Sequence, residues 1–344
     1  MAPLAKFAGI PRLVFYQSGR RPRDCRAALG NGRGRAKRRG SFWANVVCEK
    51  SRAVFESGTA AQRWTGRRGV ANLKTFTENE PASPINARYP VTRVLYRGKS
   101  KYQKILVFES PFHGRVLALD DIVQLTTREE HFYHELLVHP ILQAHPQPRN
   151  VLIIGGGDGG AAREAVKYPA LEKIVQCELD AQVVAVARKF FPRVAAGYAD
   201  RRVELRFENG QAFMRASGAL WDAIILDLTD PLGPAKPLFE RRFYKLCADH
   251  LTPNGFLCAQ TESLHFHRDL VRTVTRTLRD LFAYVEVATV PLAMYPGNWW
   301  TFTIASKTLD PKVARNQFTP RTRIYARADH AWFFLPAHVR AKIL

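Results

Sequence analysis

Two patterns of apolar positions follow one another along this chain. Between about residues 74 and 127, short alternating or β-branched runs are separated by polar turns, as in Val91–Tyr96, Ile105–Phe108 and Val116–Leu119. This alternation predicts a small antiparallel sheet of four to six strands. Residues His131–Leu142 then carry apolar side chains at helical spacing, and the proline-rich segment after them predicts the end of a helix.

From residue 150 the pattern becomes strand, loop and helix in repetition. Val151–Ile154 is a continuous apolar run, as expected for a strand buried on both faces of a parallel sheet, and a glycine-rich loop follows it. Four further strands are predicted, at Lys173–Cys177, Val203–Phe207, Ala223–Leu226 and Gly255–Ala259. Helices such as Asp180–Phe190 fill the intervals. The pattern predicts a doubly wound α/β sheet, which binds ligands at the carboxyl ends of its strands.

The first 70 residues follow neither pattern. They hold 16 Lys or Arg against 3 Asp or Glu, whereas the whole chain of 344 residues holds 52 against 30. More than half of the net charge of +22 therefore lies in one fifth of the chain. A basic segment without hydrophobic periodicity predicts a disordered extension over residues 1–73. A nucleic-acid-binding arm, a targeting segment and a protein start later than Met1 are the alternatives.

Composition narrows the class of protein. Hydrophobic residues make up 46% and charged residues 24%, which is typical of a globular domain. No apolar stretch reaches the roughly 18 residues that a membrane span requires. The five cysteines are scattered without a CxxC pair, which favours a reducing compartment over a disulfide framework or a zinc site. We therefore expect a cytoplasmic protein without a metal site or a membrane partner, in which only the basic extension would contact nucleic acid.

A glycine loop predicts a nucleoside site. Gly155, Gly157 and Gly160 form a GxGxxG pattern between a predicted strand and a predicted helix, where glycines permit a tight turn and a close approach of backbone to ligand. Glu178 ends the next strand, where a carboxylate can bind both hydroxyls of a ribose. These residues indicate an adenosine-type ligand, which nicotinamide-dependent enzymes and methyltransferases share.

Carboxylates around this loop change the expected chemistry. Asp158 lies inside the loop, where it would repel a pyrophosphate or the α-carboxylate of S-adenosylmethionine and favour an ammonium group. Asp227 and Asp230 follow the fourth predicted strand and suit a cationic substrate, and Gln260 follows the fifth. A helix cap at Asp158 and plain turn roles at Asp227 and Asp230 are the alternatives.

At this level of detail the sequence resembles the spermidine synthase family from about residue 74 to the C-terminus. The motifs that carry the resemblance are KYQKILVFES, VLALDDIVQLTTREEHFYHELLVHP, VLIIGGGDGGAAREAVKYP, CELD, DLTDPLGPAKPLFERRFY, AQTES and HAWFFLPAHV. The resemblance implies a small antiparallel β-domain over 74–127 and a Rossmann-like, S-adenosylmethionine-methyltransferase-like catalytic domain over 128–344. It implies a polyamine aminopropyltransferase without a prosthetic group, active as a homodimer or homotetramer.

The resemblance also implies a reaction and a role for each candidate residue. Decarboxylated S-adenosylmethionine would be the co-substrate and putrescine the acceptor, giving spermidine and methylthioadenosine. The donor would be bound by Gln103, Gly155, Gly157, Asp158, Glu178, Asn209 and Gly210. Asp227 would be the catalytic carboxylate, with Tyr133 beside it. The acceptor channel would be lined by His134, Asp230, Gln260 and Tyr295.

Three departures from the family pattern bear on substrate choice. Asn209 stands where an Asp usually reads the adenine, Lys236 replaces a Glu, and Asn298 replaces a glycine. Agmatine, cadaverine and spermidine are therefore alternative acceptors. An S-adenosylmethionine methyltransferase and a nucleic-acid-binding protein are the alternatives from other classes.

Overall fold

The computed structural model describes residues 74–78, 83–230 and 233–344, so the extension predicted over 1–73 lies outside the described residues. The described part begins with short strands, β1 (Lys74–Glu78), β2 (Ala87–Val91), β3 (Arg93–Lys99), β4 (Lys104–Ser110), β5 (Gly114–Leu119) and β6 (Ile122–Thr126). They form two sheets instead of one: β1 pairs with β2, and β3–β6 form an antiparallel sheet. The strand predicted at Val91–Tyr96 is divided at Thr92, because the chain there changes its pairing partner from β1 to β4.

Helix α2 (Glu130–Ala144) follows and is buried along almost its whole length. Its buried polar side chains have specific partners. Glu135 accepts hydrogen bonds from three consecutive backbone N–H groups at residues 323–325, and His139 contacts Glu164 at 2.8 Å. These bonds explain how a helix with one predicted apolar stripe can be covered on its other sides as well.

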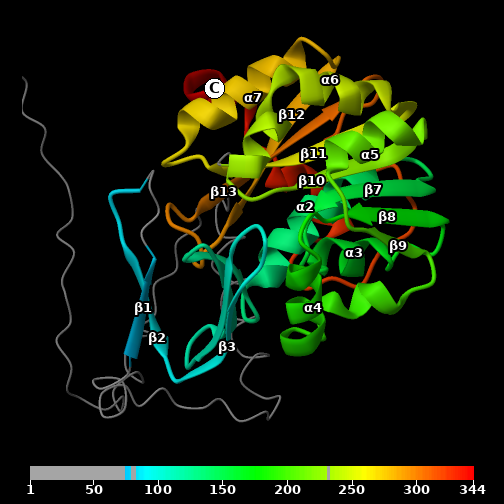
Figure 1. Cartoon of the computed structure of the whole chain (residues 1–344). Helices are drawn as coiled ribbons and strands as arrows, with labels where there is room; N and C mark the ends of the chain where they lie inside the picture. Colours follow the sequence, from blue (N-terminus) through cyan, green and yellow to red (C-terminus); the bar gives the residue numbers. More distant parts are fainter. Residues whose placement is uncertain (1–73, 79–82, 231–232) are drawn as a thin grey trace, which may run out of the picture. The chain divides into compact units, whose positions relative to one another are not determined.

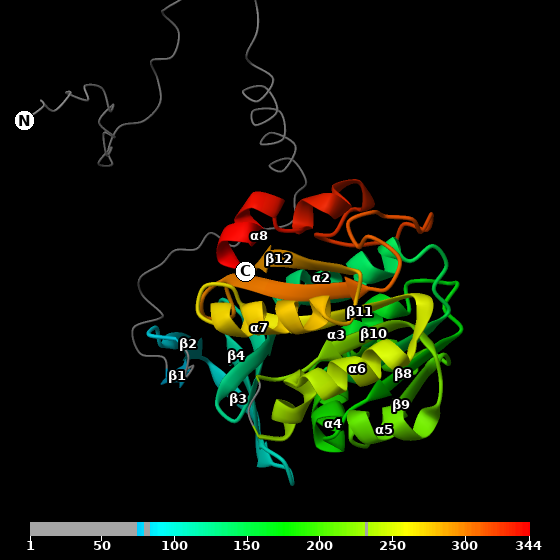
Figure 2. The same ribbon diagram turned by 90° about the horizontal axis from the view of Figure 1, so that it is seen from above.

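A seven-stranded sheet forms the centre of the described part (Figures 1 and 2). Its strands are β7 (Asn150–Gly155), β8 (Lys173–Cys177), β9 (Val203–Arg206), β10 (Trp221–Asp227), β11 (Leu251–Ser263), β12 (Tyr284–Pro291) and β13 (Trp299–Ser306). The spatial order is β12-β13-β11-β10-β7-β8-β9, and β13 is antiparallel to both neighbours. The order reverses between β7 and β10, which is the switch point at which such sheets bind ligands.

Helices cover both faces of this sheet, and the strand sequences show why. The remaining helices are α3 (Gly160–Ala165), α4 (Ala181–Phe190), α5 (Gly210–Ser217), α6 (Arg241–Asp249), α7 (Arg268–Arg279) and α8 (Ala337–Ile343), with 3-10 helices η1 (Ala195–Ala199), η2 (Gly233–Phe239) and η3 (Arg327–Phe333). Val151 and Ile153 of β7 pack in one core with α2 and α3, whereas Leu152 and Ile154 pack in the other with α5, α6 and α7. Figure 2 shows α6 and α7 on the side of the sheet opposite α2.

The four-stranded sheet packs on the core through α4. Val183 and Val186 of α4 share a buried cluster with Ile105, Leu117 and Leu125 of the small sheet. This packing places the loops of the small sheet beside the carboxyl ends of β7 and β8. None of the described helices is long and apolar enough to cross a membrane.

Candidate functional site

A cavity of about 330 Å³ lies at the carboxyl ends of the central strands, bordered by β5 and β6 of the small sheet. Such a volume is at the lower end of that of small-molecule sites. Twelve of the candidate residues contribute to its wall: Gln103, Tyr133, Gly155, Gly157, Asp158, Glu178, Asn209, Gly210, Asp227, Asp230, Gln260 and Tyr295. The fold therefore brings together residues that are up to about 190 positions apart in the sequence.

The glycine loop is shaped by its contact with Asp227. Gly155 and Gly156 have φ angles of 84° and 67°, in the region that favours glycine. A Cβ atom on Gly155 would overlap the Asp227 carbonyl, and one on Gly156 would lie 2.5 Å from Asp227 Oδ2. The N–H of Gly156 donates to the Asp227 carbonyl at 2.9 Å. Glycines are thus required here so that the loop can close against the end of β10.

Asp227 and Tyr133 form a buried pair. The Tyr133 hydroxyl donates to Asp227 Oδ1 at 2.6 Å, whereas Asp227 Oδ2 is buried and has no hydrogen-bond partner among the described residues. Burial and the nearby Asp158 raise the pKa of Asp227 to about 6, although His134 and the Tyr133 hydrogen bond act in the opposite direction. Burial and the negative charge of Asp227 hold the pKa of Tyr133 well above its usual range, so the phenol remains a donor. The pair therefore has one carboxylate oxygen held by a hydrogen bond and a second, buried oxygen that is not.

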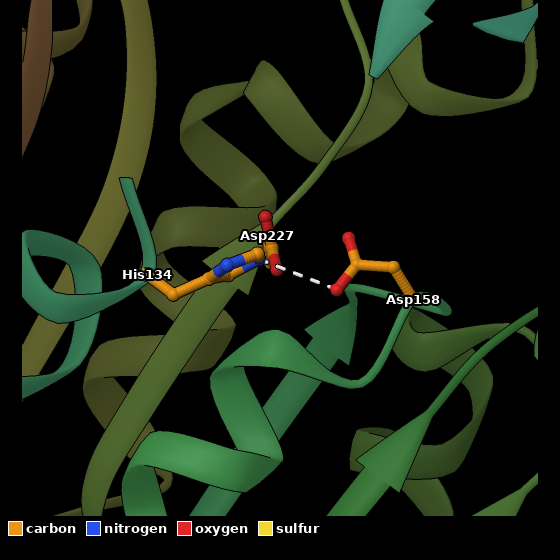
Figure 3. A group of neighbouring side chains, drawn as sticks. All are labelled: His134, Asp158 and Asp227. Atoms are coloured by element: carbon orange, nitrogen blue, oxygen red, sulfur yellow. Dashed lines mark ion pairs between the residues drawn. The ribbon is translucent and has the colours of Figure 1, made fainter. Parts of the chain in front are cut away.

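His134 points toward Asp158 and forms an ion pair with it, as Figure 3 shows. Its Nδ1 is 2.8 Å from Glu130 Oε2, and its Nε2 is 3.3 Å from Asp158 Oδ1. Burial opposes the charged ring, but Asp158 and Glu130 outweigh it and raise the pKa of His134 to about 10. The side chain is 2% exposed and is not among the residues that line the cavity. The structure thus differs from the prediction that His134 lines the acceptor channel, because the imidazole is enclosed between two carboxylates.

His134, Asp158 and Asp227 each offer an atom within 4.8 Å of the others, a spacing that would suit a metal ion. However, a doubly protonated imidazole has no lone pair with which to bind one. Both ring nitrogens of His134 already face carboxylate oxygens, those of Glu130 and Asp158, and these carboxylates favour the protonated ring. With His134 protonated, this cluster offers a metal ion the carboxylates of Asp158 and Asp227 alone.

Asp158 lies two residues before the first residue of α3 and lines the cavity. Its Oδ1 accepts a hydrogen bond of 2.7 Å from the N–H of Gly160, two residues further on. The helix-cap role that stood as the alternative is wrong, because the N-cap of α3 is Gly159 and no described side chain caps that helix. The bond to Gly160 instead holds the carboxylate in the turn that leads into α3.

One end of the cavity contains two partly buried side chains, Gln103 from the turn between β3 and β4 and Glu178 from the loop after β8. Gln103 Nε2 donates to Asp180 Oδ2 at 3.0 Å, and Glu178 Oε1 accepts from the Asp180 N–H at 2.8 Å. Burial raises the pKa of Glu178 to about 7, although backbone N–H groups lower it. Asn209 caps α5, since its Oδ1 accepts from the Ala212 N–H at 3.0 Å.

At the other end of the cavity, polar side chains are held by strands β6 and β11 and by the loop after β10. Gln260 is buried and donates to the Leu228 carbonyl at 3.1 Å and to Glu262 at 2.6 Å. The Tyr295 hydroxyl donates to the Gln124 carbonyl at 2.6 Å, and its ring packs on Trp300 with centroids 4.4 Å apart.

The departures at 236 and 298 have different structural settings. Asn298 has a φ of 54°, a conformation that glycine adopts freely and Asn tolerates. The backbone of the Asn298 turn is therefore compatible with the substitution. Lys236 is exposed on η2 and is not among the lining residues, whereas its neighbour Ala235 lines the cavity.

Sequence reasoning missed several residues of the cavity wall. Glu78 in β1 lines the cavity and accepts hydrogen bonds from Tyr89 at 2.9 Å and from the Val123 N–H at 2.8 Å. A single Glu in a short strand carries no motif that would identify it. Asp180 was also missed, although its position two residues after Glu178 and directly before α4 was a usable signal.

The fold and the acidic cavity at its switch point define a Rossmann-like, S-adenosylmethionine-methyltransferase-like protein. Comparison with known families is more specific. Residues 75–127 match the spermidine synthase tetramerisation domain, and residues 130–317 match the spermine/spermidine synthase domain. The chain therefore belongs to the spermidine synthase family of polyamine aminopropyltransferases, as the motifs predicted.

Individual relatives agree with this assignment. The chain is 41% identical over 269 residues to a polyamine aminopropyltransferase of Hydrogenobaculum sp., covering 78% of this chain and 96% of the relative. It is 40% identical to spermidine synthase of Dictyostelium discoideum, covering 68% and 82%. A solved spermidine synthase in complex with the transition state analogue AdoDATO is 34% identical with a TM-score of 0.75, covering 80% of this chain and 98% of that one. The spermidine synthase of Thermotoga maritima superposes with a TM-score of 0.73 at 32% identity, covering 80% and 97%.

Proposed function

We propose that this enzyme transfers the aminopropyl group of decarboxylated S-adenosylmethionine to putrescine, giving spermidine and methylthioadenosine. The observation that carries the proposal is the buried Asp227–Tyr133 pair at the wall of a cavity that Asp158 also lines. Two carboxylates in one small cavity favour a substrate with positive charges. The complex of a related spermidine synthase with AdoDATO supports the same class of donor.

The donor is assigned to the glycine-loop side of the cavity. Gln103 and Glu178 bind the ribose hydroxyls, and Asn209 with Gly210 reads the adenine. Gly155 and Gly157 let the loop backbone approach the donor. Asp158 holds the ammonium of the aminopropyl group, for which its fixed carboxylate is well placed. His134 acts through Asp158, because it contacts that carboxylate and not the cavity.

The reaction is a displacement at carbon. An amine nitrogen attacks the methylene carbon next to the sulfonium, a C–N bond forms, and the electron pair of the broken C–S bond goes to sulfur, which leaves as neutral methylthioadenosine. The obstacle is that an alkylamine has a pKa of about 10, by analogy with lysine, and is protonated at neutral pH. Asp227 accepts that proton, and Tyr133 fixes the carboxylate in the direction of attack. Alignment of two bound reactants supplies up to roughly 7–11 kcal/mol of the acceleration.

The acceptor is assigned to the opposite side of the cavity. Asp230, Gln260 and Tyr295 bind and orient the diamine, and the bonds of Gln260 and Tyr295 to their neighbours hold them in place. Putrescine is the assigned acceptor because related proteins are named spermidine synthase, and spermidine is putrescine that has gained one aminopropyl group.

The organisation of the whole protein is part of the proposal. We assign residues 1–73 to a basic extension, 74–127 to a small β-domain and 128–344 to the catalytic domain. The match of residues 75–127 to a tetramerisation domain supports a homodimer or homotetramer. We assign the enzyme to the cytoplasm, because its substrates are small cations and its cysteines are without disulfide motifs.

The test is product analysis by mass spectrometry. The purified enzyme is mixed with decarboxylated S-adenosylmethionine and, in separate reactions, putrescine, cadaverine, agmatine and spermidine, with S-adenosylmethionine as the control donor. We expect spermidine and methylthioadenosine from putrescine, and no transfer from the control donor. Preference for another amine would overturn the acceptor but keep the reaction, whereas no transfer to any amine would overturn the proposed function.

A further inference from the structure

A hydrogen-bond network joins the small sheet to the donor end of the cavity, and Asp180 is at its centre. Asp180 Oδ2 accepts from Ser100 Oγ at 2.6 Å and from Gln103 Nε2 at 3.0 Å. The backbone N–H of Asp180 donates to Glu178 Oε1 at 2.8 Å. One residue therefore contacts both side chains that the proposed function assigns to the ribose, although Gln103 lies in the β3–β4 turn and Glu178 follows β8 of the other sheet.

Asp180 also caps α4, but the cap uses only one of its oxygens. Asp180 Oδ1 accepts from the Gln182 N–H at 3.0 Å. Asn, Ser or Thr at this position would satisfy that helix end about equally well. Oδ2 is instead committed to the turn between β3 and β4, and the residue is 3% exposed. Helix capping alone therefore does not account for a buried carboxylate with this set of partners.

The turn that Asp180 holds is itself ordered by Ser100. Ser100 Oγ accepts from the N–H groups of Tyr102 and Gln103 at 3.0 and 3.1 Å, and its hydroxyl proton is directed to Asp180. Because Ser100 already accepts two bonds, it can act toward Asp180 only as a donor, which requires an oxygen acceptor there. A second link between the same elements runs from Gln182 Nε2 to the Tyr96 hydroxyl at 2.6 Å.

We propose that Asp180 is a positioning residue for donor binding, which fixes the Gln103 amide and the Glu178 carboxylate in the arrangement that binds the ribose and fastens the β3–β4 turn beside the cavity. Groups that are already ordered lose less freedom when a ligand binds. The inference rests on the proposed function, because the ribose roles of Gln103 and Glu178 belong to it.

The decisive variant is Asp180→Asn. It retains Oδ1 as the cap of α4 but replaces the second oxygen with an NH₂ group, which cannot accept from Ser100 or Gln103. We expect the KM for decarboxylated S-adenosylmethionine and the Kd for methylthioadenosine to rise by about tenfold to hundredfold, the range for a lost hydrogen bond to a charged group. The kcat and the KM for the amine should stay within about twofold, since only binding of the donor is affected.

Two conditions isolate this effect. Removal of the Asp180 charge also makes ionisation of Glu178 easier, because burial first and then Asp180 raise the pKa of Glu178 to about 7. Measurements at about pH 8.5 keep Glu178 ionised in both the wild type and Asp180→Asn. Asp200→Asn is the matched control: Asp200 bonds to Arg202 and does not line the cavity, so the variant changes a charge and a hydrogen bond without contact to the site.

A third variant tests the link to the small sheet. Ser100→Ala should raise the KM for the donor in the same direction, and the double variant Ser100→Ala/Asp180→Asn should show less than the combined effect, because both changes break the same bond. Full additivity of the two variants would overturn the link.

Other results would overturn the positioning role itself. A lowered unfolding temperature with unchanged donor KM would reduce Asp180 to a structural cap. Parallel losses in kcat and in the KM for the amine would indicate general damage to the site. The measurement of methylthioadenosine binding separates this inference from the proposed function. Wild-type protein that binds methylthioadenosine without transferring an aminopropyl group would overturn the proposed function. The Kd values of wild type and Asp180→Asn for methylthioadenosine would still decide the positioning role.

Discussion

Asp227 has the two properties that a general base for an ammonium requires. One oxygen is fixed by Tyr133 at 2.6 Å, and the other is buried without a partner in the described part of the chain. An unsatisfied buried acceptor is costly in a folded protein, and one of the accepted reasons for such a group is a catalytic role. A cationic substrate that donated a hydrogen bond to this oxygen would remove the cost of leaving it unsatisfied.

Substitution of Asp227 tests this assignment. Asp227→Asn preserves the shape of the side chain and a hydrogen bond to Tyr133 but cannot accept the proton of the attacking amine. We expect kcat to fall by on the order of 100-fold or more, the range that general acid–base catalysis supplies. The measurement is single-turnover release of methylthioadenosine with both substrates saturating. Near-normal turnover would show that another group removes the proton.

The pH profile gives a second, independent test of the same residue. Burial and Asp158 raise the pKa of Asp227 to about 6, so the basic form is present above that pH and is lost as the pH falls through it. We expect kcat/KM for the amine, measured at saturating donor, to fall about tenfold per pH unit below this pKa. Ionisation of the amine changes the activity of wild type and of Asp227→Asn in the same way. The decrease of kcat/KM below pH 6 comes from Asp227 alone and should therefore be absent from the residual activity of the variant. A limb near the ordinary carboxylate pKa would contradict the assignment.

Among the secondary-structure elements, strands with mostly apolar buried side chains were predicted from the sequence, whereas strands with buried polar side chains were not. The strand predicted at Lys173–Cys177 is β8 with the same bounds, and both of its faces are covered, since Ile174–Cys177 are all buried. Strands β12 and β13 were not predicted. Each contains Thr among its apolar residues, as in Thr301 and Thr303, which are buried and bonded to Thr261 across the sheet. Such cross-strand pairs are set by tertiary structure and have no local signal.

In the site, too, residues whose positions depend on their own segment were predictable, whereas those placed by contacts between distant segments were not. The glycine loop and Asp227 were predictable because each lies at the end of an apolar strand, and parallel strands bring their ends together. The position of His134 was not, since the family motif places it near the site but does not indicate on which side of Asp158 it lies. A Cβ atom on Gly160 would overlap the His134 ring, so α2 and α3 approach each other closely there. That helix contact, and not the motif, directs the imidazole to Asp158.

At the scale of the whole molecule, charge and catalysis separate along the chain. Every residue that lines the cavity lies between Glu78 and Trp300. Residues 1–70 contribute 16 basic and 3 acidic side chains, so the remaining residues hold 36 basic and 27 acidic ones, a net charge of +9. The basic excess that suggests nucleic-acid binding is therefore concentrated outside the part of the sequence that contains the candidate site.

Removal of residues 1–73 tests whether the two properties are independent. We expect the truncated enzyme to keep kcat/KM for aminopropyl transfer within about twofold, because every described residue that lines the cavity lies outside residues 1–73. Truncation should lower any affinity of the chain for duplex DNA at low salt by more than about tenfold. The affinity should also lose most of its dependence on salt, since that dependence scales with the number of DNA phosphates that the protein neutralises. Both proteins are compared by filter binding and by transfer assay, with circular dichroism as the control for folding. Loss of transfer in a folded truncated protein would mean that the basic segment contributes to the active site, and undiminished DNA binding would place the nucleic-acid surface on the catalytic body instead.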